Sequence, residues 1–143
     1  MPSAIHPLLA RSLRQSKRLR KFFDSLPEST RAQIDHSVRE VKKEETRLRR
    51  AQQAAEYLME AMEAELDPPP LIKMAFARNA KACRGWELMP QSLRREYLIA
   101  IFRSRFPETR ARWLERTLLE SARYADSPHQ PFVRLAKTVP IPR

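Results

Sequence analysis

Glycine is almost absent from this sequence of 143 residues, which contains only one. Tight turns with positive φ, β-hairpins and phosphate-cradling loops all depend on glycine, because other residues are strained at those backbone angles. The shortage disfavours a β-rich fold and a glycine-rich nucleotide-binding loop. We therefore predict an all-α protein.

Cysteine and long apolar runs are also missing. Cys83 is the single cysteine, which excludes an internal disulfide and a zinc site built on several cysteines. No apolar run approaches the ~20 residues that a membrane-spanning helix needs. The first ten residues are uncharged and the chain then turns basic, the reverse of a secretory signal peptide. We expect a cytoplasmic protein without a transmembrane segment.

The residue types that usually catalyse reactions form no recognisable constellation. His6, His36 and His129 share no metal-ligand spacing, and we expect Cys83 to have no histidine or carboxylate near it in the sequence. We expect a protein that is not an enzyme and that needs no cofactor or metal. A site assembled through space stays open at this stage.

The charge is strongly positive. The formal net charge is +11, and 21 of the 28 cationic residues are arginine. Such a balance suits phosphates, carboxylates or an acidic protein, although a high arginine share also follows from genomic base composition. Two kinds of partner therefore stay open: an acidic protein, which we favour, and a nucleic acid. The oligomeric state is undetermined.

The sequence repeats itself with a constant offset. Shifting it by 63 places residues 7–58 on 70–121 without a gap. The identical pairs are Pro7/Pro70, Leu8/Leu71, Pro27/Pro90, Ser29/Ser92, Arg31/Arg94, Glu45/Glu108, Thr46/Thr109, Arg47/Arg110 and Arg49/Arg112. We predict a tandem duplication of a unit of four short helices, packed as one domain. The repeats span 1–66 and 67–125, and 126–143 form an extended tail.

Matched residues mark where each helix should begin. Pro7 and Pro70 suit the first turn of a helix, and Ser16 and Asn79 suit the N-cap of the next one. The segments 26–29 and 89–92 open a third helix. The fourth begins near Glu44, because its counterpart is a proline. The stripe along this fourth helix predicts a packed helix pair and consists of Leu48, Ala51, Ala55, Leu58 and Met62.

The motif Glu-Thr-Arg-x-Arg at 45–49 and 108–112 is the strongest local signal. Its glutamates precede an arginine by four residues in both copies, which predicts ion pairs along the helix. The candidate residues for scaffold or anion binding are Arg31, Thr46, Arg47, Arg94, Thr109 and Arg110. We favour the scaffold for these arginines, because structural ion pairs outnumber functional ones.

A basic patch lies between residues 11 and 21, where no acid occurs. Its members are Arg11, Arg14, Lys17, Arg18, Arg20 and Lys21. Three interpretations stay open: a solvated face, a nucleic-acid surface and a mitochondrial-type presequence. The recurrence of the same helix at 70–84 disfavours the presequence, and we favour the solvated face.

These motifs resemble the YdeI/OmpD-associated family, the bacteriocin-protection proteins. The helical C-terminal module of that family is similar to the second copy at Met89, Pro90, Ser92, Arg94, Arg95, Glu96, Tyr97, Glu108, Thr109 and Arg110. The first copy keeps Leu26, Pro27, Ser29, Arg31, Glu45, Thr46 and Arg47 but departs from the pattern at Ala32 and Ile34.

The resemblance implies a non-enzymatic role in withstanding bacteriocins or cationic antimicrobial peptides, through association with envelope proteins. It supplies no catalytic residues. Family members carry one such module behind a separate N-terminal domain, whereas this sequence shows the module twice. The resemblance and the charge together predict a module that binds other proteins.

Overall fold

The structure, a computed structural model, describes residues 4–127, and this part of the chain contains eight α-helices and no strand. The helices are α1 (Pro7–Leu13), α2 (Lys17–Asp24), α3 (Glu28–Arg39), α4 (Glu44–Leu66), α5 (Pro70–Ala77), α6 (Ala80–Leu88), α7 (Gln91–Arg103) and α8 (Pro107–Asp126). The expectation of an all-α fold is confirmed. Of the predicted tail, only Asp126 and Ser127 are described, and Asp126 ends α8.

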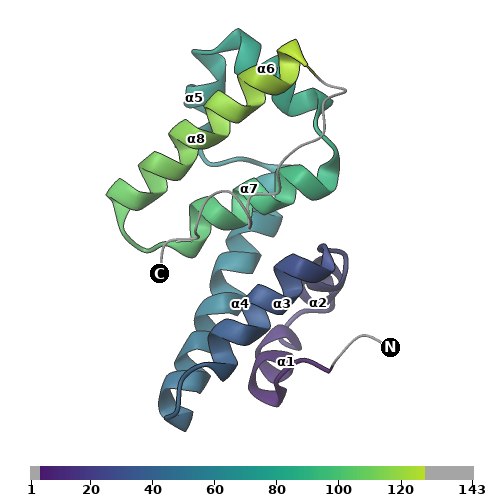
Figure 1. Cartoon of the computed structure of the whole chain (residues 1–143), viewed down its shortest axis with the longest axis vertical. Coiled ribbons are helices and arrows are strands. Elements are labelled where there is room, and N and C mark those ends of the chain that lie inside the picture. The colour runs from purple at the N-terminus through teal and green to yellow at the C-terminus, as the bar shows by residue number, and fades with distance from the viewer. Residues whose placement is uncertain (1–3, 128–143) are drawn as a thin grey trace.

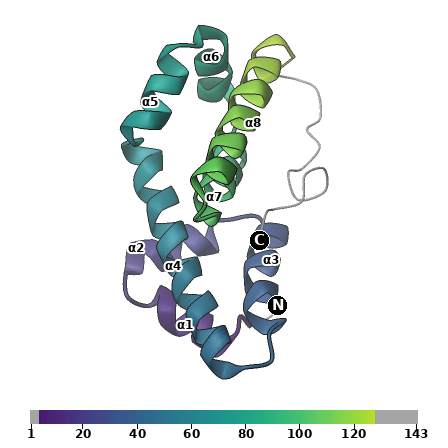
Figure 2. The ribbon, with the colours of Figure 1, turned by 90° about the vertical axis from the view of Figure 1, so that its left-hand side faces the viewer.

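The helices form two groups, one above the other (Figure 1). Helices α1 to α3 surround the first part of α4, and helices α5 to α8 form the other group (Figures 1 and 2). The long helix α4 extends from the first group to the second, where α7 packs across it. This crossing of α4 and α7 joins the two halves of the molecule.

The helix starts repeat with the predicted offset. Each of the four starts in the second half lies 63 residues after its counterpart: 70 − 7, 80 − 17, 91 − 28 and 107 − 44. The fourth helices differ in length, with 23 residues in α4 and 20 in α8. The expected helix boundaries are thus found. The duplication itself stays a prediction, which this spacing supports.

The predicted caps are present at the second helix of each half. The Ser16 hydroxyl accepts a hydrogen bond from the Leu19 amide at 3.3 Å, and the Asn79 side chain accepts one from the Ala82 amide at 3.0 Å. Each bond satisfies an amide that has no partner within the helix. A further cap was not predicted: His6 Nδ1 accepts from the Leu8 amide at 3.1 Å at the start of α1.

The two halves pack their fourth helices differently. In the first half α1 makes the largest contact with α4, whereas in the second half α6 makes the largest contact with α8. Gly85 of α6 explains the second arrangement, because a Cβ atom at this position would overlap the Ser121 carbonyl group of α8. The only glycine of the chain therefore permits close helix packing instead of a turn.

Most of the predicted stripe on α4 is buried. Ala51, Ala55, Leu58 and Met62 lie in the core, but Leu48 is 39% exposed, so its assignment to the stripe was wrong. Leu48 lies in the second turn of α4. Trp86 packs on Phe76 with ring centroids 5.2 Å apart, within its own half.

Polar side chains of α7 lock the two halves together. Arg95 forms two bonds to the Glu65 carboxylate of α4, from Nε at 2.6 Å and from Nη2 at 2.9 Å. Its guanidinium also donates to the Ser25 hydroxyl at 2.6 Å and lies 4.9 Å from the centre of the Phe22 ring. One α7 side chain thereby contacts both α4 and the end of α2.

The neighbouring residue makes a second contact between the halves. Glu96 is buried, and it accepts a hydrogen bond from the buried Thr30 hydroxyl of α3 at 3.1 Å. The positions equivalent to Arg95 and Glu96 in the first half hold Ala32 and Gln33. The two halves thus differ where the second half makes polar contacts to the first.

Candidate functional site

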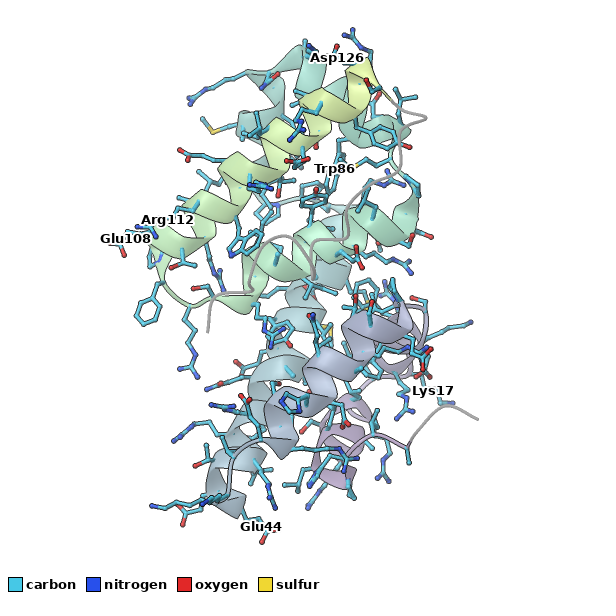
Figure 3. The ribbon with its side chains drawn as sticks, in the orientation of Figure 1. Lys17, Glu44, Trp86, Glu108, Arg112 and Asp126 are labelled. Atoms are coloured by element: carbon cyan, nitrogen blue, oxygen red, sulfur yellow. The ribbon has the colours of Figure 1, made fainter. Side chains whose placement is uncertain are left out.

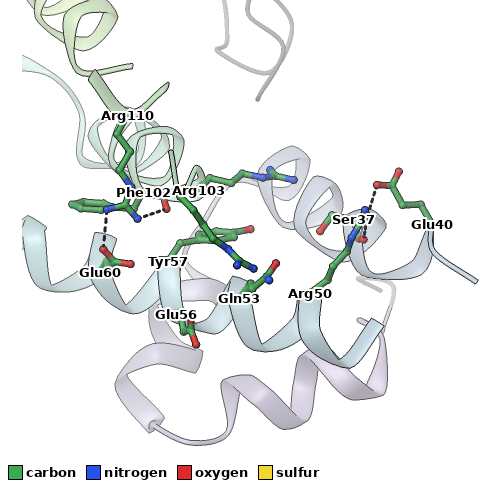
Figure 4. Close-up of a pocket in the computed structure, with 11 residues that line it drawn as sticks. Ser37, Glu40, Arg50, Gln53, Glu56, Tyr57, Glu60, Phe102, Arg103 and Arg110 are labelled. Carbon is green, nitrogen blue, oxygen red and sulfur yellow. Dashed lines mark hydrogen bonds and ion pairs between the residues drawn. The ribbon is translucent and has the colours of Figure 1, made fainter. Parts of the chain in front are cut away.

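A groove of about 310 Å³ opens between the two halves, over one face of α4 (Figure 4). Helices α3, α4, α7 and α8 and the connections α3–α4 and α7–α8 contribute its walls. The lining residues are Ser37, Glu40, Arg50, Gln53, Glu56, Tyr57, Glu60, Phe102, Arg103, Arg105 and Arg110. The lining contains four arginines and three glutamates, so the groove is polar. A charged ligand can bind there only to side chains that are not already paired with one another.

Two of the four arginines are committed to structural contacts. Arg50 donates to the Glu40 carboxylate at 2.6 Å and to the Ser37 carbonyl at 2.8 Å, which fixes the end of α3 against α4. Arg110 lies 3.5 Å from the Glu60 carboxylate, with its guanidinium carbon 5.5 Å from the centre of the Phe102 ring. These bonds hold the walls of the groove in place (Figure 4).

The other two arginines have no carboxylate partner in the described part of the chain. Arg103 is half-buried, and its guanidinium carbon lies 5.9 Å from the centre of the Tyr57 ring. Arg105 is exposed in the connection between α7 and α8. Glu56 is exposed and also lacks an ion pair among the described residues. The unpaired charge of the groove is therefore two guanidinium groups and one carboxylate.

Tyr57 is the most unusual residue of the groove. Its side chain is 8% exposed, and its buried hydroxyl has no hydrogen-bond partner among the described residues. Burial raises the pKa of the Tyr57 phenol, although the positive charge of Arg103 partly opposes this. The hydroxyl therefore keeps its proton at neutral pH and can donate it to an acceptor.

The predicted arginines Arg47 and Arg110 occupy equivalent places in the two halves. Arg47 Nε donates to the Val41 carbonyl at 2.8 Å, and Arg110 Nε donates to the Ser104 carbonyl at 2.5 Å. Arg110 Nη2 also donates to the Phe102 carbonyl at 3.3 Å. Each arginine thus secures the connection between the third and fourth helices, which agrees with the scaffold interpretation.

The other predicted residues of this group behave less uniformly. Arg31 Nε donates to the Leu26 carbonyl at 3.0 Å, whereas the buried Nε of its counterpart Arg94 has no partner among the described residues. Thr46 and Thr109 are half-buried in the first turns of their helices.

The ion pairs expected within the repeated motif do not form. Glu45, Arg49, Glu108 and Arg112 are all exposed, and none has an ion-pair partner within residues 4–127. Figure 3 shows Glu108 and Arg112 at the outer end of α8, directed away from the other helices. Solvent competes with such exposed pairs, and their net stabilisation is small.

The residues of the basic patch lie on α1, on α2 and in the turn between them. Arg11, Arg14, Lys17, Arg18 and Lys21 are exposed and have no carboxylate partner among the described residues. Arg20 differs, because its Nε donates to both oxygens of Asp24 at 3.1 Å. Lys17 lies at the outer edge of the first half (Figure 3).

Cys83 does have an acidic neighbour, which the sequence reasoning overlooked. Glu87 follows it by one turn of α6, and the thiol lies 3.8 Å from the Glu87 carboxylate. Burial and the charge of Glu87 raise the pKa of the thiol, so the contact does not activate it as a nucleophile.

Sequence reasoning placed one groove residue, Arg110, among its candidates and missed the others. A signal for them was available in the repeat: Glu40 and Arg103 occupy equivalent positions, carry opposite charges and line the same groove. Tyr57 could not be found in this way, because its hydrophobic neighbours on α4 make it resemble an ordinary core residue. Only the contacts show that its hydroxyl is unsatisfied.

Two classes of site are not found in residues 4–127. No group of three or more His, Cys, Asp or Glu side chains there could hold a metal ion. None of the helices in this region has the length and apolar character needed to cross a bilayer.

Comparisons with known proteins agree with the resemblance noted in the sequence. The family model described as "Bacteriocin-protection, YdeI or OmpD-Associated" matches residues 3–61. The comparison with curated proteins and the comparison with solved structures each found no match. The family match covers α1 to α3 and most of α4, so the second copy stays a prediction. The resemblance is thus confirmed for residues 3–61, which match the bacteriocin-protection, YdeI- or OmpD-associated family.

Proposed function

We propose that the protein is a non-enzymatic interaction module that binds an acidic protein partner and contributes to bacterial protection against bacteriocins or cationic antimicrobial peptides. The family match over residues 3–61 supports the protective role. The basic patch on α1 and α2 lies within the matched segment and supplies the surface for the partner. A cytoplasmic location remains part of the proposal.

The observation that supports this most directly is the division of α1 and α2 into two faces. Their apolar residues Leu9, Leu13, Leu19, Phe22 and Phe23 are buried in the core. The five unpaired cations of the basic patch occupy the exposed positions between them. Because the core needs only the apolar face, the charged face is available to attract and orient an acidic surface.

The raised pKa values of three described side chains are consistent with the proposed non-enzymatic role. Tyr57, Cys83 and Tyr97 have raised pKa values, in each case mainly because burial disfavours the charged form. A nucleophile or a general base needs its deprotonated form near neutral pH, which such shifts oppose.

A charge-reversal variant tests the proposal. The variant Lys17→Glu, Arg18→Glu, Lys21→Glu reverses the patch, and Lys42→Glu, Arg49→Glu, Arg112→Glu is the matched control at exposed cations elsewhere. Each variant would be expressed in a bacterium that lacks the gene for this protein. The survival of the cells would then be measured in the presence of a cationic antimicrobial peptide. We expect the patch variant to lose protection and the control to keep it. If both variants protect equally well, the basic patch is not the surface that provides protection.

Nucleic-acid binding is the alternative, because the same cations could pair with phosphates. The affinity of the purified protein for duplex DNA and RNA, measured across a range of salt concentrations, separates the two. A phosphate-binding surface loses affinity steeply as salt rises. A tight complex with that dependence, lost in the patch variant, would favour the alternative. Weak binding even at low salt would exclude it.

A further inference from the structure

We propose that the groove between the two halves binds an organic carboxylate, which accepts a hydrogen bond from the Tyr57 hydroxyl and pairs with the Arg103 guanidinium. This site is separate from the basic patch on α1 and α2 and goes beyond the proposed protein-binding function. Its ligand is defined by the polar groups that the protein itself leaves unsatisfied in the groove.

The Tyr57 hydroxyl is a hydrogen-bond donor without an acceptor among the described residues. Buried hydroxyl groups nearly always have a hydrogen-bond partner, and one without a partner is costly. In Figure 4 the Tyr57 ring lies between the Arg103 side chain and α4, and its hydroxyl end is directed toward Ser37. No described residue accepts its proton. A ligand oxygen in the groove would satisfy this donor once the side chains that cover the hydroxyl move aside.

Arg103 specifies the charge of that ligand. Its guanidinium lies over the Tyr57 ring, which orients the planar group without using its hydrogen-bond donors. No described carboxylate pairs with it. A phenol donor and a free guanidinium side by side suit one oxyanion, and Arg105 at the rim adds a second positive charge.

The remaining lining favours a carboxylate over a phosphate. Glu40, Glu56 and Glu60 line the same groove, so a ligand with two negative charges on one group would be repelled more strongly than one with a single charge. The rings of Tyr57 and Phe102 also line the groove and suit a short hydrocarbon chain. The volume of about 310 Å³ is at the lower end of the range for small-molecule sites, near ~300–1,000 Å³.

The carboxylate can come from a free small molecule or from an acidic peptide. The test titrates the purified protein at constant ionic strength with glutarate, with a tetraglutamate peptide and with inorganic phosphate. The readout is the Nε–H NMR signal of each arginine. We expect glutarate, the peptide or both to shift the Arg103 signal in a saturable manner while leaving the exposed Arg112 signal unchanged. The responding probe identifies the source of the carboxylate.

Two variants test whether the responding probe binds in the groove. Tyr57→Phe removes only an unsatisfied hydroxyl and should fold normally. Arg103→Gln removes the charge without breaking an ion pair. We expect each variant to lower the affinity for the responding probe about tenfold, the effect of losing one hydrogen bond to a charged group. Arg112→Gln is the matched control and should leave the affinity unchanged.

The proposal is overturned if neither carboxylate shifts Arg103, if phosphate binds as well as they do, or if Tyr57→Phe and Arg103→Gln bind like the unmodified protein. None of these outcomes bears on protection by the basic patch, because its cations lie on α1 and α2, outside the groove. The triple charge-reversal variant of the patch should accordingly keep its glutarate or peptide affinity.

Discussion

Arg47 and Arg110 make the same hydrogen bond in the two halves of the molecule: each donates from Nε to the carbonyl oxygen six residues before it. The accepting residues, Val41 and Ser104, are themselves 104 − 41 = 63 residues apart. The bond crosses the connection between the third and fourth helices, whose carbonyls have no helical partner. An arginine at this place determines how the fourth helix begins.

Removing either arginine should therefore lower stability. We expect Arg47→Ala and Arg110→Ala each to lower the free energy of unfolding by about 1–3 kcal/mol, because a loop carbonyl loses its donor. Arg47→Lys and Arg110→Lys should restore little of the lost stability, since lysine lacks the planar guanidinium group. Urea unfolding measures the change, and Arg49→Ala and Arg112→Ala are exposed controls that should stay within about 0.5 kcal/mol. If the four variants unfold alike, the two arginines are not scaffold residues.

Local signals predicted the helices well because they act within a few residues. Pro7, Ser16 and Asn79 each determine a helix start through their own backbone or side chain. The relation between the two halves could not be read in this way. It depends on contacts such as Arg95 with Glu65, whose partners are 30 residues apart.

The groove was largely missed for a related reason. Its residues come from four helices and two connections, and each looks ordinary in its own segment. Arg103 resembles a cation at the C-terminal end of a helix, where it would be expected for its effect on the helix dipole. Leu48 shows the opposite error: a regular spacing placed it in the core, although its side chain is exposed.

Gly85 provides a test of the α6–α8 packing. On an exposed helix, Gly→Ala stabilises by about 1 kcal/mol. Here the added Cβ would overlap the Ser121 carbonyl, which belongs to a helix backbone and cannot move aside freely. We expect Gly85→Ala to lower the free energy of unfolding by about 2 kcal/mol or more, as overpacked cores do.

Ala111→Gly, at an exposed position of α8, is the matched control for Gly85→Ala. It should lower the free energy of unfolding by about 1 kcal/mol through helix propensity alone. Thermal unfolding followed by circular dichroism measures both changes. A stabilised Gly85→Ala variant would mean that the two helices are farther apart than described.

The ion pair between Arg95 and Glu65 should stabilise the fold more than the ion pairs at the surface do. Its side chains are only 16% and 18% exposed, and the two hydrogen bonds are bidentate. A double-mutant cycle with Arg95→Ala and Glu65→Ala should give a coupling energy of about 1–3 kcal/mol. For the exposed pair Arg20–Asp24, at 40% and 51%, we expect less than about 0.5 kcal/mol. Equal coupling in the two cycles would show that α7 is not locked to α4 by this bond.

The last prediction concerns alkaline pH. Burial raises the pKa of Tyr57 and of Tyr97 above the usual value of about 10, and in Tyr97 the charge of Glu120 adds to the effect. Below pH 10 both the folded and the unfolded chain keep these protons, so the two groups cause no pH dependence. Above pH 10 the unfolded chain loses them first, which favours unfolding. Each tyrosine should then lower the free energy of unfolding by about 1.4 kcal/mol per pH unit until its folded-state pKa is reached.

Urea unfolding between pH 9 and pH 11.5 measures this dependence, with the double variant Tyr57→Phe, Tyr97→Phe as the comparison. Lysines also titrate in this range, but they contribute equally to both proteins, so the difference between the two slopes belongs to the tyrosines. We expect the unmodified protein to lose stability more steeply than the double variant once the pH exceeds 10. Parallel curves would mean that both phenols ionise as readily in the folded chain as in the unfolded one, which contradicts their burial in the core.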